Sequence, residues 1–401
     1  MDLAGIYRAE YGRCVATLAR LLGDINLAEE AVQDAFTTAL QKWQTLPPNP
    51  GAWIVTTARN RAVDRLRRES TREARHAQAL LLYHQDEPSE VGPVRDDQLR
   101  LIFTCCHPAL APEARTALTL RLLGGLDVPE IARAYLVQEA TVAQRIVRAK
   151  NKKKIRDAAI PYRVPAEHEL PDRLPPVLAV LYLMFNEGYA STAGPLIRTD
   201  LCAEAVRLAR ELAALMPDEP EVLGLLALLL LTEARRPARL GPAGDLVLLA
   251  DQDRSLWNRQ LIVEGHELVR RCLRRNRPGP YQIQAAIGAV HTDGAATDWQ
   301  QVLALYDQLL ALAPTPVVAL NRAVAVAEVH GPAVALAALE GVDLPRYHRL
   351  PATRAELLVR LGRNDEARAA YDQAAALATN PTERAYLETR RDELTGEWRA
   401  S

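Results

Sequence analysis

The chain has 401 residues and a formal net charge of −1, with 49% of its residues hydrophobic and 25% charged. This length favours two or three domains, and the hydrophobic content excludes a wholly disordered chain. Leucine and alanine dominate while phenylalanine occurs three times, which favours helices over a sheet sandwich.

The sequence predicts a soluble, cytoplasmic protein. Its longest apolar stretch, residues 222–231, is about half as long as a membrane-spanning helix. No basic segment followed by an apolar one opens the chain in the manner of a secretory signal. Five cysteines without a CxxC pair fit a reducing compartment better than a disulfide framework. We therefore expect a cytoplasmic location and no membrane partner.

The near-zero net charge conceals two basic islands. Residues 59–76 contain seven arginines against three acidic residues, and residues 143–156 contain seven arginines and lysines without an acidic residue. A single island is as often a solvated helix face as a binding surface. Two islands on an acidic remainder favour two contacts with a polyanion.

Residues 1–76 are predicted to form a first helical domain. Asp24 can cap a helix over 27–43, and prolines then end that helix before a third one begins near Ala52 and enters the first basic island. Trp43 and Trp53 flank the proline-rich break. Aromatic side chains beside a basic helix suit the capture of a single strand, but they can also plug a core, which we favour for Trp53.

Two breaks divide the rest of the chain. Residues 77–95 are predicted to be a flexible linker, because acidic residues, proline, serine and glycine gather there without periodicity. A second helical domain follows over 96–160. A proline-punctuated junction, 161–190, then precedes a C-terminal helical domain over 191–401.

The strongest local motif is a helix-turn-helix within residues 126–155. A short helix over 128–135, with proline at a tolerated early position, precedes a tight connection and a second helix over 139–150. The second helix of this motif enters the major groove of DNA, where Gln and Arg read base edges and Thr and Lys hold phosphates. No glycine occupies the turn. The side chains predicted to face outward are Thr141, Gln144, Arg145, Arg148 and Lys150.

The C-terminal domain carries the spacing of a helical repeat. Small residues fall where two antiparallel helices would approach, and an aromatic residue falls between repeats: Ala355, Gly362, Ala367, Tyr371 and Ala374. The run LGRNDEARAAYDQAAALATNP resembles the tetratricopeptide (TPR) family. Earlier units, which end at Pro217 and Pro314, are degenerate, and an irregular helical bundle is the alternative.

Other polar groups give weaker signals. Cys105, Cys106 and His107 are adjacent, and adjacent residues of a helix point in different directions, so a buried structural role is favoured over redox sensing or zinc binding. The motif NEGY at 186–189 is typical of a helix end with a glycine stop, with a small-molecule or interface role as the alternative. We find no phosphate loop, serine triad or paired-carboxylate signature, and predict no enzymatic activity, no cofactor and no metal.

The order of the motifs resembles that of a bacterial RNA polymerase sigma factor of the extracytoplasmic-function (ECF) type. Residues 28–43, AEEAVQDAFTTALQKW, and 50–68, PGAWIVTTARNRAVDRLRR, resemble region 2. Residues 111–150, APEARTALTLRLLGGLDVPEIARAYLVQEATVAQRIVRAK, resemble region 4. Two ordered blocks agree, and the remaining half resembles the C-terminal helical extension of one ECF subgroup.

The resemblance implies two partners, core RNA polymerase and promoter DNA. The acidic and polar face of the second helix matches the surface that docks on the polymerase clamp: Glu29, Glu30, Gln33 and Asp34. The loop 45–51 and the basic helix match the reader of the minus-ten element: Asn60, Arg61, Arg65 and Arg68. The helix 139–150 matches the minus-thirty-five reader, with Gln144 and Arg148 as base contacts.

These observations predict an all-α protein. Two small helical domains bind DNA and polymerase, the second through a helix-turn-helix, and a TPR-like helical-repeat domain follows. The predicted function is that of a sigma factor for specific promoters, with the repeat domain modulating activity in cis and offering a surface to a protein partner. The alternatives are a DNA-binding transcriptional regulator with a repeat domain for a ligand or partner, and a scaffold that binds nucleic acid nonspecifically.

Overall fold

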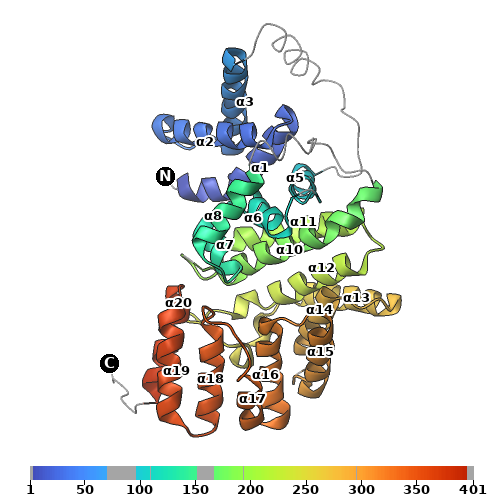
Figure 1. The fold of residues 1–401 in the computed structure, drawn as a ribbon, viewed down its shortest axis with the longest axis vertical. Helices are drawn as coiled ribbons and strands as arrows, with labels where there is room; N and C mark the ends of the chain where they lie inside the picture. Colours follow the sequence, from blue (N-terminus) through green and yellow to red (C-terminus); the bar gives the residue numbers. More distant parts are fainter. Residues whose placement is uncertain are drawn as a thin grey trace. The chain divides into compact units, whose positions relative to one another are not determined.

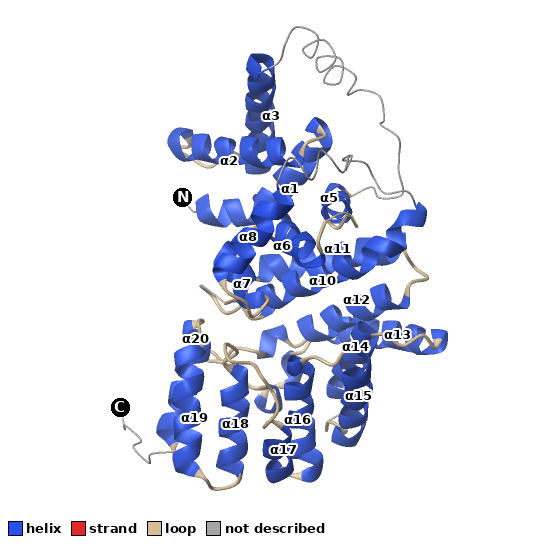
Figure 2. Cartoon of the chain, viewed as in Figure 1, coloured by secondary structure: helices blue, strands red, loops and turns tan. Residues whose placement is uncertain are grey.

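The computed structural model describes residues 3–69, 96–108, 110–150, 167–192, 194–294 and 296–394. Within these ranges the regular elements are α-helices and short 3₁₀ turns, and Leu240 and Leu246 form an isolated bridge rather than a strand (Figure 2). The all-helical prediction is confirmed for the described residues. The predicted linker, 77–95, lies outside them.

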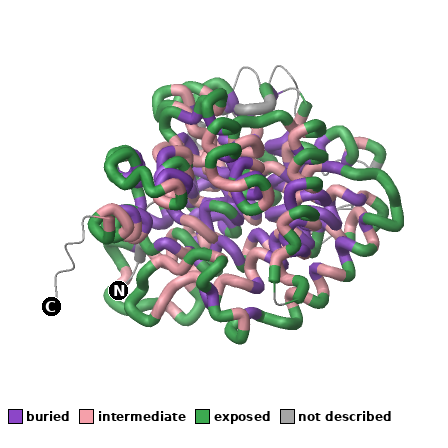
Figure 3. Tube along the Cα trace, turned by 90° about the horizontal axis from the view of Figure 1, so that it is seen from below, coloured by how far each residue is buried: buried purple, intermediate pink, exposed green. Residues whose placement is uncertain are grey.

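The chain separates into two compact units, Met1–Met184 and Phe185–Ser401. They are called here the N-terminal unit and the C-terminal unit. Many helices carry both buried and exposed positions, purple and green in Figure 3, whereas α5 (Asp97–Cys105) and α12 (Pro220–Glu233) are buried along most of their length. The presence of both kinds of position is what an amphipathic helix on a core requires.

Three mutually packed helices begin the N-terminal unit: α1 (Leu3–Leu22), α2 (Ile25–Lys42) and α3 (Pro50–Glu69) (Figure 1). Asp24 caps α2, since its carboxylate accepts the backbone N–H groups of Asn26 at 2.8 Å and Leu27 at 3.0 Å. Asn49 caps α3 in the same way, through Ala52 N at 3.0 Å. Polar residues at the two helix starts therefore set the bounds of this bundle.

Four further helices follow: α5 (Asp97–Cys105), α6 (Pro112–Leu123), α7 (Val128–Ala134) and α8 (Glu139–Lys150). A reciprocal capping box opens α7, because Asp127 accepts from Glu130 N at 2.8 Å while Glu130 accepts from Asp127 N at 2.7 Å. α8 packs on α6 and α7. The two helices of the predicted helix-turn-helix are confirmed.

Helix α1 also packs against α5 and α6, so the two helical blocks share one helix. Gly12 permits the approach, because a Cβ atom there would lie 2.3 Å from the carbonyl oxygen of Leu123. Arg20 Nε lies 2.9 Å from an oxygen of Asp97, and Thr17 donates to the same carboxylate at 3.4 Å. Close backbone packing and one partly exposed ion pair thus join α1 to the second block.

The predicted junction 161–190 is helical over most of its described length. A 3₁₀ turn (Glu167–Glu169) leads into α10 (Leu170–Tyr189), which contains Pro175 and Pro176. Arg173, 4% exposed, donates to the carbonyl of Phe103 at 3.1 Å and so ties α10 to α5. The expectation that prolines break the chain here is therefore wrong for 170–189. Packing of α10 against its neighbours outweighs the backbone hydrogen bonds lost at the prolines.

The C-terminal unit is a succession of helices, labelled as in Figure 1: α11 (Thr199–Leu215), α12 (Pro220–Glu233), α13 (Arg259–Arg275), α14 (Pro280–Thr292), α15 (Trp299–Leu312), α16 (Pro316–His330), α17 (Pro332–Ala338), α18 (Arg349–Arg360), α19 (Asn364–Leu377) and α20 (Pro381–Glu393). Five of them begin at a proline. The backbone N–H of the first helical residue has no acceptor within the helix, so proline, which lacks this group, costs no hydrogen bond there. Three 3₁₀ turns lie between α12 and α13: Arg236–Ala238, Leu249–Asp251 and Arg254–Leu256.

The predicted helix pair around Gly362 is confirmed. α18 and α19 pack together, and Ala355, Ala367 and Ala374 are fully buried between them with Tyr371. Gly362 joins the helices at φ +72°, where other residues are strained. Small side chains let the backbones approach, and the tyrosine ring fills the space that they leave.

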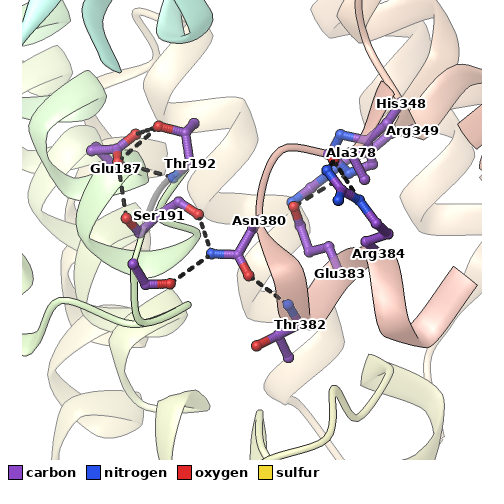
Figure 4. A network of polar contacts seen from close by, with 11 residues as sticks. Glu187, Ser191, Thr192, His348, Arg349, Ala378, Asn380, Thr382, Glu383 and Arg384 are labelled. Atoms are coloured by element: carbon purple, nitrogen blue, oxygen red, sulfur yellow. Dashed lines mark hydrogen bonds and ion pairs between the residues drawn. The ribbon is translucent and has the colours of Figure 1, made fainter. Parts of the chain in front are cut away.

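A buried polar network joins the beginning of the C-terminal unit to its end (Figure 4). Glu187 accepts from Ser191 Oγ at 3.1 Å and Thr192 N at 3.0 Å, which closes the turn after α10. Asn380 caps α20 and also donates to the carbonyls of Ser191 at 2.8 Å and Gly194 at 3.3 Å. Residues 189 positions apart are therefore held together.

The NEGY motif is not the predicted glycine stop. α10 continues to Tyr189, and Gly188 lies inside it. A Cβ atom at Gly188 would lie 2.8 Å from the backbone nitrogen and sulfur of Cys202, so the glycine permits the close approach of α11. The glutamate supplies the hydrogen bonds of the following turn. Among the described residues, none of the helices is both long enough and apolar enough to span a bilayer.

Two glycines provide a test of the packing of α12 against α14. A methyl group at Gly224 would lie 2.7 Å from Gln282 N and 2.8 Å from its Cα, whereas at Gly288 it would lie 3.5 Å from Leu231. We expect Gly224→Ala to lower the free energy of unfolding by about 1–3 kcal/mol through backbone displacement. Gly288→Ala should leave it unchanged or raise it by up to about 1 kcal/mol through helix propensity.

Chemical denaturation of both variants, followed by circular dichroism, measures the difference. Equal stability of the two variants would contradict the close approach of α12 and α14. Gly288→Ala is the matched control, because it adds the same methyl group to a helix of the same unit.

Candidate nucleic-acid interface

The turn between α7 and α8 achieves its sharp reversal without glycine. Leu136 takes φ +54°, and the N–H groups of Leu136 and Val137 donate to the carbonyls of Arg133 and Ala132, each at 3.0 Å. These bonds satisfy carbonyls at the end of α7. The left-handed conformation costs a leucine about 1–2 kcal/mol, and the packing of α7 on α8 compensates for that cost.

Helix α8 presents one buried and one exposed face. Val142, Ile146 and Ala149 are buried. Gln144 and Arg148 are exposed, and Thr141 and Arg145 are half-buried, with the Arg145 guanidinium carbon 6.0 Å from the centre of the Tyr135 ring. The side chain of Lys150, the last residue of α8, lies outside the described residues.

Val147 is a surface residue that the sequence analysis missed. Its side chain is 68% exposed on α8, between Gln144 and Arg148. A large apolar side chain that faces water on a helix otherwise rich in Arg and Gln suits contact with the methyl group of thymine. Its position in the sequence could have predicted this exposure. Val147 follows Gln144 by three residues, so it lies on the same side of the helix as Gln144 and not on the side of the buried Val142, Ile146 and Ala149.

The predicted acidic face of α2 is smaller than the sequence suggested. Glu30, Gln33 and Asp34 are exposed, whereas Glu29 is buried at 6% exposure and accepts from Gln33 Nε2 at 3.3 Å. The expectation that Glu29 contributes a surface carboxylate is therefore wrong. Glu29 lies on the buried side of α2 with Ala28 and Val32. Its carboxylate orients the side chain of Gln33 through their hydrogen bond.

Ion pairs connect this face of α2 with the basic helix α3. Arg65 pairs with Glu30, and Arg61 Nη1 lies 3.9 Å from Asp34 Oδ2. Asn60 is exposed beside them on α3. The side chain of Arg68 lies outside the described residues. Residues predicted to touch polymerase and residues predicted to touch DNA are thus ion-pair partners on adjacent helices.

Trp43 and Trp53 pack edge to face across the loop between α2 and α3. Their ring centres are 5.1 Å apart with an interplanar angle of 68°. Both residues are half-buried, while Leu46 in the intervening loop is 52% exposed. Trp53 is therefore paired with Trp43 beside the loop rather than fully enclosed in a core, and each ring covers part of the other.

The cysteines are buried thiols rather than reactive ones. All five are free and buried. Burial raises the pKa of Cys14, Cys106 and Cys202 to about 12 and that of Cys272 to about 11, and it raises the pKa of Cys105 further. Within the described ranges, no group of three or more His, Cys, Asp or Glu residues could hold a metal ion.

Comparison with known proteins matches three parts of the chain to protein families. Sigma-70 region 2 matches residues 6–72, Sigma-70 region 4 matches residues 100–152, and a family of unknown function, DUF6596, matches residues 173–273. The probable ECF RNA polymerase sigma factor SigI of Mycobacterium tuberculosis is 28% identical over 43% of this chain and 60% of its own length. The ECF RNA polymerase sigma factor SigK of Mycobacterium ulcerans is 29% identical over 33% of this chain and 74% of its own.

The α1–α3 bundle and the α5–α8 block are therefore sigma-70 region 2 and region 4 domains, homologous to those of ECF sigma factors. Sigma-70 domains are not enzymes, and they bind core RNA polymerase and promoter DNA. An uncharacterized protein of Rhizobium meliloti is 45% identical over 96% of this chain and 94% of its own length. The chain belongs to the same family as that protein.

The burial of the thiols predicts their reactivity. With a pKa near 12, on the order of one thiol in ten thousand is ionised at pH 8, and the thiolate is the reactive form. We expect a disulfide reagent such as DTNB to modify none of the five cysteines of the folded protein within minutes, and all five in denaturant. Rapid modification of one or two cysteines at pH 8 would restore the redox-sensing alternative for Cys105 and Cys106.

Proposed function

We propose that the chain is an ECF-type sigma factor that directs core RNA polymerase to specific promoters. The observation that carries the proposal is the presence of both domains in order, with the polar face of α8 opposite its buried stripe. The polymerase supplies the phosphoryl chemistry, and this chain supplies recognition. Such a function belongs in the cytoplasm.

In this proposal α8 reads the minus-thirty-five element. Gln144 and Arg148 are exposed on one face and can each form paired hydrogen bonds with base edges. Thr141, Arg145 and Lys150 contact phosphates, and Val147 contacts a thymine methyl group. The absence of acidic residues over 143–156 supports the approach of α8 to DNA, because no carboxylate in that stretch repels the phosphates.

The basic face of α3 and the loop before it capture the unpaired minus-ten strand. Asn60, Arg61, Arg65 and Arg68 hold its backbone and bases, and binding to unpaired bases favours the open state of the promoter. The exposed Leu46 gives the loop an apolar surface beside the paired tryptophans. Loop and helix together offer the mixture of apolar and cationic groups that single strands bind.

The surface for core polymerase is formed by Glu30, Gln33 and Asp34. Exposed ion pairs contribute about 0–1 kcal/mol each, so exchanging the partners Arg61 and Arg65 for basic residues of polymerase costs little. That exchange would also release both arginines toward the DNA strand. Glu29 keeps a positioning role through its hydrogen bond to Gln33.

We further propose that the C-terminal unit is a TPR-like array that modulates the factor in cis and offers a surface to a protein partner. The packing of Ala355, Ala367, Ala374 and Tyr371 around the Gly362 turn supports a repeat unit. An irregular helical bundle remains the alternative for the earlier helices. The DUF6596 match gives this part of the chain no assigned role.

The promoter-reading role of α8 is tested by run-off transcription with purified core enzyme on a promoter library. Gln144→Ala and Arg148→Ala should each reduce transcription from the selected promoter by roughly 5- to 150-fold, the equivalent of about 1–3 kcal/mol, and should relax the minus-thirty-five preference. Arg274→Ala on α13 removes a comparably exposed cation and should change nothing. Equal activity on promoter and random DNA would instead favour the nonspecific scaffold.

The polymerase surface is tested by retention of core enzyme on the immobilised full-length chain. Gln33→Ala with Asp34→Arg should reduce retention at least tenfold, because it removes a polar group and reverses a charge on the exposed face. Asp365→Arg, at the exposed start of α19, is the control, because it changes the net charge by the same two units. Unchanged retention together with tight binding of duplex DNA by the chain alone would favour the DNA-binding regulator.

The cis role is tested with a chain that ends after Thr192. This chain keeps α10 and therefore the bond from Arg173 to Phe103, which an end at Tyr162 would remove. We expect promoter-specific run-off transcription to differ between the short and full-length chains at equal occupancy of polymerase. Identical transcription would exclude modulation in cis.

A further inference from the structure

The segment between α12 and α13 brings several arginines into the interior of the C-terminal unit. Arg235 and Arg239 belong to the 3₁₀ region that follows α12, and both are half-buried. They meet Tyr189 at the end of α10 and, through Arg349 and Glu383, the helices α18 and α20. The group Arg235, Arg236, Arg239 and Arg349 is called here the arginine cluster.

Arg239 is incompletely satisfied. Its guanidinium carbon lies 4.5 Å from the centre of the Tyr189 ring, a cation–π contact. Its Nε–H is buried and has no hydrogen-bond partner among the described residues. Burial lowers the pKa of Arg239 and the positive charge of Arg349 lowers it further, while Tyr189, a hydrogen-bond partner of the side chain, and Glu383 oppose the shift. A buried donor without an acceptor is unfavourable, which favours the binding of an acceptor group at this position.

Arg235 lies in the same environment, where its Nε–H donates at 3.3 Å to the backbone carbonyl four positions earlier. Burial lowers its pKa, and the hydroxyl groups of Tyr189 and Tyr306 are the ionisable groups that oppose this effect. Burial, with the charges of Arg235 and Arg254, also lowers the pKa of His291 to about 4. The positive field therefore extends from α18 toward α14.

The carboxylates in this region are fewer than the guanidinium groups. Glu383, 8% exposed, is shared between His348 at 3.5 Å and Arg349 at 3.4 Å (Figure 4). Glu233 pairs with Arg236 at 2.6 Å. Asp200 lies in the same neighbourhood, around Cys202, and Glu383 also acts on Arg239, so that four guanidinium groups are near three carboxylates. Buried positive charge in excess of the carboxylates is unfavourable unless a counter-ion binds.

We propose that the arginine cluster is a binding site for a small anion that carries phosphate or carboxylate groups. Guanidinium groups match both anions with paired hydrogen bonds, and the hydroxyls of Tyr189 and Tyr306 are further donors. The side chains are reachable, since Arg235, Arg239 and both tyrosines are half-buried and the Arg349 side chain is 47% exposed. The inference is independent of the sigma-factor function and concerns the C-terminal unit alone.

The test is thermal unfolding of the full-length chain in inorganic phosphate, in succinate and in chloride at equal ionic strength. We expect phosphate or succinate at millimolar concentration to raise the midpoint of unfolding by roughly 2–4 °C over chloride. A larger shift in phosphate assigns a phosphorylated ligand, and a larger shift in succinate assigns a carboxylate. No shift with either anion overturns the proposal.

Two variants locate the site. Arg239→Gln should abolish the anion-dependent shift, and it should not lower the midpoint in chloride, because it removes the excess positive charge. Arg274→Gln, on the exposed face of α13, should keep the full shift. If the circular dichroism spectrum shows that Arg239→Gln is unfolded, Arg349→Gln is tested in its place, because the Arg349 side chain is more exposed. An undiminished shift in the folded variant places the anion elsewhere and overturns the proposal.

Discussion

Close packing of α1, a helix of region 2, against region 4 determines how the N-terminal unit presents its two predicted DNA-contacting helices. The absence of a side chain at Gly12 brings α1 against the carbonyl of Leu123, and Arg20 with Thr17 holds Asp97 at the start of α5. The bundle that carries α3 and the block that carries α8 therefore share one support. Packing interfaces of this kind change in discrete steps rather than continuously, so a different spacing of the two helices requires this contact to open.

Charge compensation separates the two basic islands that the sequence presents as alike. On α3, Arg61 and Arg65 face acidic partners on α2, which partly neutralise them in the folded unit. On α8, acidic residues are absent after Glu139, and the outer face carries Gln144, Val147 and Arg148. The positive potential of α8 is therefore available to DNA without rearrangement, whereas that of α3 increases when another protein takes its acidic partners.

Local signals predicted the local structure well. Asp24 and Gly362 each fix a helix start or a turn through their own side chain or backbone, and the structure confirms the elements they delimit. The outward positions Gln144 and Arg148 followed from helical periodicity alone. Long-range packing decided the rest. The burial of Glu29, the passage of α10 through its prolines and the close approach at Gly188 depend on partners that periodicity does not reveal.

The hydrogen bonds of Asn380 tie the turn before α20 to the turn after α10, so two distant parts of the C-terminal unit are joined directly. An open stack can gain or lose a repeat at either end, since each repeat touches its neighbours alone. Here, duplication or deletion of one helix pair between Ser191 and Asn380 would move the two residues apart, break these hydrogen bonds and expose both residues to water.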